Sequence, residues 1–124
     1  MALLKRFDML EIATADLTGA VKTYRENFGF GLQPGSAIDS ATLKVGGAEI
    51  RLIAGAAAAA LIASTGEGLA GLWLEAEDIG QVLAALKSAG IEPPVPRVDK
   101  ERRVLALDPN IANQVPLFIF DRKA

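Results

Sequence analysis

Two stretches of the chain show the same order of hydrophobic patterns, with a strand-like stretch followed by a helix-like one. In the first, apolar and polar side chains alternate over residues 6–14, as in a strand that packs one face on a helix layer. Apolar residues then recur every three or four positions and predict an amphipathic helix over 17–28, with Tyr24 and Phe28 packed in the core. Asp16 and Gly29 are typical of the residues that begin and end such a helix.

The second stretch repeats this order in the C-terminal half. It predicts a strand over 71–76 and a helix over 79–89, which begins after Asp78 and ends before Gly90. With Met9 aligned to Gly71, the polar and apolar positions agree through both elements. A repeat of about half the chain indicates two copies of one supersecondary unit.

The rest of the chain supplies three further strands to each copy. Gly46-Gly47 is a tight hairpin signal between two of them. The expected strands lie at the start of 31–40, where a turn follows, and at 41–45, 49–53, 95–98, 103–107 and 115–121. We therefore predict an α+β fold with two βαβββ modules, residues 6–54 and 70–122, joined by linker 55–69 in a single domain, 1–124. Alternation along the strands predicts a curled mixed sheet around a pocket, with the helices on its outer face.

Composition narrows the function. The chain has 124 residues and a formal net charge of −2, so it lacks the basic footprint of a nucleic-acid-binding protein. The basic run at 100–103 is expected to be a solvated hairpin end. Cysteine and histidine are absent, which excludes disulfides, thiolate metal sites and the usual general base. No signal peptide is apparent, and the apolar run at 53–63 is shorter than the ~20 residues that cross a bilayer. We expect a cytoplasmic protein with no membrane partner.

Four segments resemble the vicinal oxygen chelate superfamily, which includes glyoxalase I, methylmalonyl-CoA epimerase, extradiol dioxygenases and the fosfomycin- and bleomycin-resistance proteins. They are IATADLTGAVKTYRENFGF (12–30), ATLKVGGAEIRLI (41–53), WLEAEDI (73–79) and VLALDP (104–109). The resemblance covers nearly the whole chain and is specific for fold rather than for activity. It implies a small-molecule pocket lined by the sheet and a homodimer.

Catalytic members of this family hold a divalent metal with His and Glu residues from four strands. By position, the resemblance places these ligands at Met9, Arg51, Gly71 and, counting from Asn113, Pro116. None of these is a plausible ligand for a hard divalent ion, and Arg51 brings a fixed positive charge to the place of the cation. The substitutions therefore argue against the metal chemistry of the family, and we expect no metal and no other cofactor.

Strand parity predicts which side chains line the pocket. If Met9 faces it, so does Glu11, and with Arg51 come Glu49 and Ile53. In the C-terminal module, Trp73 and Glu75 share the face of Gly71, and Phe118 and Phe120 share the face of Pro116. The predicted ligand-binding residues are therefore Met9, Glu11, Arg51, Trp73, Glu75, Phe118 and Phe120. Glu49, near the hairpin, is expected to be a solvated edge charge. The aromatic residues are equally compatible with plain core packing. A buried carboxylate is costly without a partner, so we expect Glu11 and Glu75 to pair with Arg51, either as a structural ion pair or as a polar anchor for a ligand.

Four functions remain open from the sequence. One is a metal-free binding protein that holds a ligand among aromatic side chains, as in the bleomycin-resistance branch. Another is a metal-independent isomerase or lyase, in which Glu11 or Glu75 is a base with a pKa raised by burial and Arg51 stabilises an oxyanion. A third is a carboxylate-only site for Mg²⁺ or Mn²⁺, which Arg51 disfavours. A structural or interaction module is the fourth.

Overall fold

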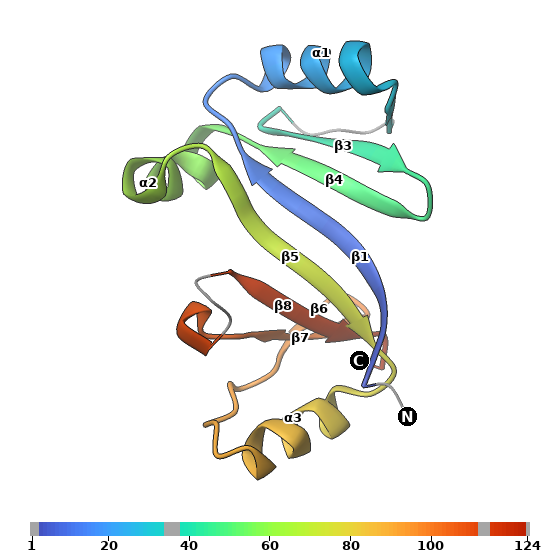
Figure 1. Cartoon of the computed structure of the whole chain (residues 1–124), viewed down its shortest axis with the longest axis vertical. Coiled ribbons are helices and arrows are strands. Elements are labelled where there is room, and N and C mark those ends of the chain that lie inside the picture. Colours follow the sequence, from blue (N-terminus) through green and yellow to red (C-terminus); the bar gives the residue numbers. More distant parts are fainter. Residues whose placement is uncertain (1–2, 34–37, 112–114, 124) are drawn as a thin grey trace. The chain divides into compact units, whose positions relative to one another are not determined.

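The computed structural model describes residues 3–33, 38–111 and 115–123, and it confirms the α+β class. The chain forms two compact units, one of residues 9–71 and the other of residues 1–8 and 72–124. Each unit holds one copy of the βαβββ order, which confirms the duplication (Figure 1). The turn expected around Pro34 and Gly35, and Asn113, lie outside the described residues.

The unit of residues 9–71 contains β1 (Leu4–Ala13, from Met9 on), α1 (Leu17–Phe28), β2 (Gly31–Leu32), β3 (Ser40–Val45) and β4 (Ala48–Ile53). Its strands lie in the order β2-β3-β4-β1, with β1 parallel to β4. The Asp16 side chain accepts a hydrogen bond from the backbone N–H of Gly19 and so caps α1, as predicted. Gly29 ends this helix with a φ of 71°, which glycine adopts without the strain of a Cβ atom.

The second unit contains β5 (Gly68–Ala76, from Leu72 on), α3 (Ile79–Ser88), β6 (Arg97–Asp99), β7 (Arg102–Ala106), a 3-10 turn (Pro109–Ile111) and β8 (Leu117–Asp121). These strands lie in the order β5-β8-β7-β6, with β5 parallel to β8. Asp78 caps α3 by accepting a hydrogen bond from the N–H of Gly80. The strand and helix boundaries agree with the sequence-based ones to within about three residues.

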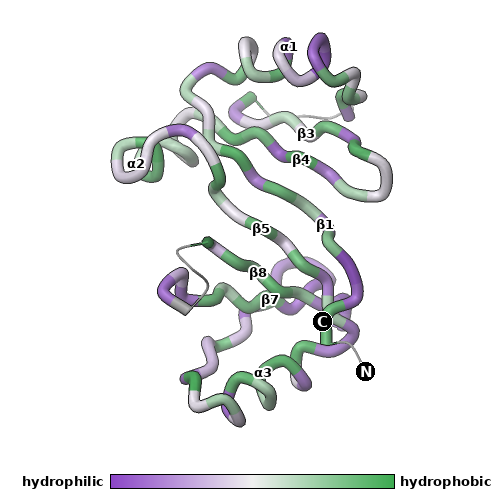
Figure 2. The backbone as a smooth tube through the Cα atoms, in the orientation of Figure 1, coloured by the Kyte–Doolittle hydropathy of each residue, from purple (hydrophilic) through white to green (hydrophobic). Residues whose placement is uncertain are grey.

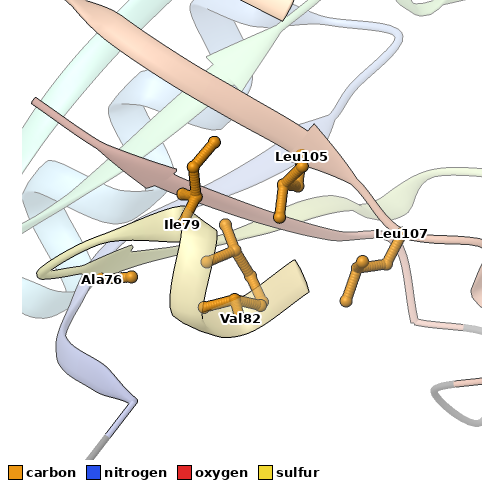
Figure 3. Packing of buried hydrophobic residues seen from close by; sticks show 6 residues of the cluster. Ala76, Ile79, Val82, Leu105 and Leu107 are labelled. Carbon is orange, nitrogen blue, oxygen red and sulfur yellow. The ribbon is translucent and has the colours of Figure 1, made fainter. Parts of the chain in front are cut away.

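Helix α3 closes one face of its sheet with a hydrophobic core (Figures 1 and 3). Ile79 and Val82 of the helix are buried, together with residues from three strands and the segment that follows β7. The buried cluster is Ala76, Ile79, Val82, Leu105, Leu107 and Ile119, and partly buried Leu74, Leu83, Leu86 and Leu117 pack against it. The apolar stripe of the predicted helix, which consists of Ile79, Val82, Leu83 and Leu86, lies in or against this core.

Helix α1 is amphipathic but less deeply packed. Hydrophilic and hydrophobic segments alternate along it (Figure 2), yet no residue of α1 is buried. The prediction that Phe28 lies in the core is wrong, because its side chain is 61% exposed. Phe28 lies at the end of the helix and stacks instead on Phe30, at 5.6 Å, while half-buried Tyr24 contacts both rings.

Most of the expected linker is a helix. Residues Gly55–Thr65 form α2, an alanine-rich helix of 11 residues, within the stretch 55–69 that was expected to be a linker. The run of alanine favours a helix, since alanine has the highest intrinsic helix propensity. Among the described helices, none is long and apolar enough to span a membrane.

Candidate functional site

An aromatic cluster occupies the sheet face of the second unit that is turned away from α3. Leu74, Ala76, Leu117 and Ile119 pack toward the helix, so the side chains that alternate with them point to the opposite face. There Trp73 lies opposite Phe118 and Glu75 opposite Phe120 in the parallel pairing of β5 with β8. The Trp73 and Phe118 rings stack with centroids 4.6 Å apart, and Phe120 contacts Trp73 at 6.2 Å. We call this surface the aromatic face.

Two guanidinium groups lie over these rings. The Arg102 guanidinium carbon is 5.2 Å from the Trp73 ring centroid and 5.1 Å from that of Phe120. The guanidinium carbon of Arg122 also lies over Phe120, 5.4 Å from its ring centroid. Such contacts are attractive because the ring face carries partial negative charge. Trp73 and Phe120 are buried, whereas the side chains of Arg102 and Arg122 are 25% and 55% exposed. The aromatic face is thus an apolar floor overlaid by arginine.

Glu75 is buried on the same face and pairs with two arginines. Its Oε1 accepts a hydrogen bond of 2.7 Å from Nε of Arg6, and its Oε2 lies 3.3 Å from Nε of Arg122. The expected partner, Arg51, is therefore not the one found. The hydrogen bond from Arg6 lowers the pKa of Glu75, burial raises it and the charge of Arg122 lowers it again, so that the net shift is downward. The prediction of a raised pKa is wrong for Glu75, and a lowered pKa makes this carboxylate a weak base.

The other predicted site residues lie on the sheet of residues 9–71. Glu11 is directly opposite Arg51 in the β1–β4 pairing, and Met9 is opposite Glu49. Glu11 Oε2 is 3.9 Å from Nη1 of Arg51, which confirms the predicted pair, although this distance is too long for a hydrogen bond. Met9 is buried, and Glu49 pairs with Lys44 at 3.3 Å on the hairpin.

The residues present do not fit the divalent metal of the resembled family. Met9 offers a thioether, Arg51 a guanidinium, Gly71 a hydrogen and Pro116 a pyrrolidine ring, none of which is an oxygen or imidazole donor. Within the described parts of the chain, no group of three or more carboxylate, histidine or cysteine side chains is arranged to hold a metal. No catalytic step through a metal can be assigned to these positions.

Three open cavities lie away from the predicted site residues. In the unit of residues 9–71, one of about 690 Å³ borders α1 at Lys22 and Arg25 and also borders Phe30, which follows the helix. Another, of about 420 Å³, lies between α1 and the sheet and includes Ile12 and Leu52. The second unit has a cavity of about 480 Å³ beside Pro93, Pro94 and Leu107. The first two are lined in part by charged and polar side chains, such as Glu26 in the first and Glu67 in the second, but none of the three is lined by a residue predicted to bind the ligand. We therefore assign the site by the side-chain chemistry of the sheet faces.

The sequence-based reasoning missed the three arginines of the aromatic face, Arg6, Arg102 and Arg122. The expectation that the basic run 100–103 is simply a solvated hairpin end is wrong for Arg102, which packs on two rings. A signal for it was present: Arg102 is two residues from Val104 and so shares its strand face, and Val104 is opposite Phe120 in the β7–β8 pairing. The same parity places Arg122 beside Phe120. No comparable signal links Arg6 to Glu75.

Comparisons with known proteins bear on the fold of the chain. The model of the Glyoxalase/Bleomycin resistance protein/Dioxygenase superfamily matches residues 6–110. Methylmalonyl-CoA epimerase from Mycobacterium tuberculosis is 24% identical, with a TM-score of 0.79 over 99% of this chain and 91% of that one. A Streptomyces coelicolor methylmalonyl-CoA epimerase variant in complex with 2-nitronate-propionyl-CoA is 24% identical, with a TM-score of 0.75 over 98% of this chain and 99% of that one. A hypothetical protein from Bacillus halodurans C-125 is 20% identical, with a TM-score of 0.76 over 96% of this chain and 95% of that one. No curated protein matches the chain. Identities this low show a shared fold.

Proposed function

The chain belongs to the Glyoxalase/Bleomycin resistance protein/Dioxygenase superfamily, and we propose that within it this protein is a metal-free small-molecule-binding protein. On the aromatic face, the partly buried Phe118 would contact the ligand, with Trp73 stacked against Phe118 and with Arg102 and Arg122 at the rim. Met9, Glu11 and Arg51 remain predicted ligand-binding residues. Methylmalonyl-CoA, which one structural relative binds, shows that this fold accommodates a small-molecule ligand.

The observation that carries this proposal is the combination of buried rings with partly exposed cations on one sheet face. Binding sites are mainly apolar, with a few placed polar groups that set orientation and specificity. These rings lie outside the core cluster beneath α3, because that helix packs on the opposite sheet face. At the metal positions of the family, the residues found here are poor ligands, which favours binding without metal-assisted chemistry.

Trp73 is the single tryptophan of the chain, so its fluorescence should report occupancy directly. We expect at least one member of a chemically diverse ligand panel to change its emission saturably. Replacing Phe118 by leucine should weaken that ligand by about 3–10-fold, because an aromatic pair contributes roughly 0.5–1.5 kcal/mol beyond its buried area. The matched change Phe28→Leu, on α1, should leave the affinity unchanged. Equal affinities for all three proteins, no response to any ligand, or metal-dependent turnover of a substrate would each reject the proposal.

An isomerase or lyase that works without metal is a second candidate. The Glu11–Arg51 pair favours it, because it joins a carboxylate to a fixed cation on one sheet face, and the related epimerase structures show that isomerases use this fold. Glu11 would remove a proton beside a carbonyl and Arg51 would stabilise the oxyanion. Glu75 is the weaker choice for the base, because Arg6 and Arg122 hold its pKa down.

If this candidate is right, the protein should catalyse exchange of the α-proton of methylmalonyl-CoA for deuterium in D₂O. The exchange rate would be measured by NMR. Glu11→Gln should reduce the exchange rate by about 100-fold or more, the usual contribution of a general base. Glu49→Gln, on the neighbouring strand, serves as the control and should keep the rate. Exchange that survives Glu11→Gln, or that is absent from the unaltered protein, would remove Glu11 from this role for that substrate.

Two further features belong to the same proposal. We propose a cytoplasmic location, and a homodimer like that implied by the family resemblance. Sedimentation of the purified protein would test the second point. A ligand-binding role for the aromatic face does not depend on either.

A further inference from the structure

We infer that the open cavity between α1 and the sheet of residues 9–71 is a ligand site for a small aliphatic ammonium compound. This inference goes beyond the proposed function, because the lining residues are different from those of the aromatic face and belong to the other unit. Three observations carry it: a helix–sheet interface that is filled in one copy of the duplication and open in the other, an apolar floor, and two carboxylates in the lining.

The two copies of the duplicated unit differ in how the helix packs on its sheet. Each helix lies over strands of its own unit (Figure 1), but α3 buries Ile79 and Val82, whereas no residue of α1 is buried. With Met9 aligned to Gly71, Ala20 of α1 stands where α3 has Val82. Alanine lacks two of the methyl groups of valine, and in a close-packed interior such a difference leaves space. The cavity of about 420 Å³ lies at this place, since Ala20 lines it.

The floor of the cavity is apolar. It is formed by Ile12 and Ala13 of β1 and by Leu52 of β4, and Ala20 lines the cavity from the helix. The volume falls within the range of about 300–1,000 Å³ that is usual for small-molecule sites, whose walls are mainly apolar. An aliphatic ligand would remove its own surface and that of the floor from water, which is favourable.

The charged side chains that line the cavity are both carboxylates, Asp16 and Glu67. Oε1 of Glu67 accepts hydrogen bonds from the backbone N–H of Ala15, at 2.6 Å, and from Oγ1 of Thr14, at 3.2 Å. These bonds hold the Glu67 side chain beside the start of α1, where Asp16 accepts a hydrogen bond from the N–H of Gly19. Two segments far apart in the sequence thus bring negative charge to the same cavity.

The sign of this charge selects the ligand. In the part of the chain that the structure describes, the hydrogen bonds of Glu67 use Oε1 and leave Oε2 as an acceptor. An ammonium group donates up to three hydrogen bonds, and those to a carboxylate are stronger than those between neutral groups. The N–H groups at the helix start partly offset the charge of Asp16, so Glu67 is the stronger anchor. An anionic ligand would be repelled by both carboxylates.

Three probes with one cyclohexyl body separate charge from shape: cyclohexylmethylammonium, cyclohexylmethanol and cyclohexanecarboxylate, titrated by calorimetry at low ionic strength. We expect the ammonium probe to bind about tenfold more tightly than the alcohol, since one hydrogen bond to a charged group accounts for such a factor, and the carboxylate to bind most weakly. Glu67→Gln should remove most of this preference and leave the affinity for the alcohol nearly unchanged. Glu26→Gln, on α1 but outside this lining, removes the same charge and should change neither affinity.

Filling the cavity tests where the probes bind. Ala20→Val introduces the residue type that α3 has at the aligned position, and it should weaken the ammonium and alcohol probes by at least about tenfold, because the added methyl groups would overlap them. Ala60→Val makes the same change at an exposed position of α2 and should leave both affinities unchanged. Circular dichroism would establish that each variant is folded. In the unaltered protein, nuclear Overhauser effects should connect the cyclohexyl protons with the methyl groups of Ala20 and Leu52.

Four results would each overturn the inference. They are tighter binding of the alcohol or the carboxylate probe, probe affinities that survive in folded Ala20→Val, Overhauser effects to other residues only, and failure of all three probes to bind. If Ala20→Val does not fold, the Overhauser effects in the unaltered protein decide the location. None of these results affects the proposed binding function, which is tested separately through Trp73 and its own ligand panel.

Discussion

Replacing Asp121 by alanine is expected to lower the free energy of unfolding by about 2–4 kcal/mol, somewhat below the usual cost of breaking a buried pair because Arg103 stays 32% exposed. The Asp121 carboxylate is fully buried at the end of β8. It accepts hydrogen bonds from the backbone N–H of Ile79, at 2.8 Å, from Nε of Arg103, at 3.0 Å, and from the N–H of Lys123. Alanine would leave these donors without their acceptor and detach the start of α3 from the sheet. Urea unfolding followed by circular dichroism would measure the loss.

The exposed ion pair between Lys5 and Glu77 supplies the matched control for Asp121→Ala. Glu77 lies 3.5 Å from Lys5 and is 70% exposed, so Glu77→Ala also removes a carboxylate near the start of α3. We expect a change of no more than about 0.5–1 kcal/mol, the usual contribution of an exposed ion pair. If the two variants were equally stable, the buried position of Asp121 would not be the source of its contribution.

Acid should erase the difference between Asp121→Ala and the unaltered protein. Burial raises the pKa of Asp121, but hydrogen bonds from Arg103, Ile79 and Lys123 lower it, and the net shift is below the ordinary value of 3.8. A carboxylate with a lowered pKa in the folded state stabilises that state above its ordinary pKa, and this stabilisation is lost as the pH falls through the folded-state value. The two unfolding free energies should therefore converge below pH 3.8.

The sequence predicted the core of the second unit well, because that core depends on local periodicity. Ile79 and Val82 fall on one side of a helix, and Ile119 alternates with aromatic neighbours on its strand. The same alternation correctly separated Trp73 and Phe118 from the helix side. Positions set by a period of 2 or 3.6 can be read before any tertiary contact is known.

Charge partners could not be read in this way. Glu75 meets Arg6, a residue 69 positions away, and the sequence carries no periodic signal for that contact. Arg51 was the expected partner because it was the cation assigned to the same predicted pocket, but in the strand register it lies opposite Glu11. Long side chains reach partners that depend on strand order and register, which single-sequence patterns do not encode. The raised pKa expected for Glu75 failed for the same reason, since burial was counted without these two arginines.

Phe120→Ala is expected to have the largest effect on stability, a loss of about 3–5 kcal/mol in the free energy of unfolding, because the truncation leaves a cavity in a packed interior. Phe120 is fully buried and lies opposite Val104, which is also fully buried. Its ring is also the surface on which Arg102 and Arg122 rest, at 5.1 Å and 5.4 Å. The loss should be measured by circular dichroism rather than by fluorescence, because Trp73 contacts this ring and its emission will change for local reasons.

The comparison with Phe28→Ala separates burial from ring chemistry. Phe28 also touches two aromatic rings but is 61% exposed, so its truncation should cost less than about 1 kcal/mol. A small loss for Phe120→Ala would show that its surroundings collapse into the space, and the aromatic face would then not be a rigid floor. With the large loss that we expect, Phe120 is a structural support of the face. Phe118 is only partly buried, so a ligand can reach it, and it is the position where packing and binding can be separated by mutation.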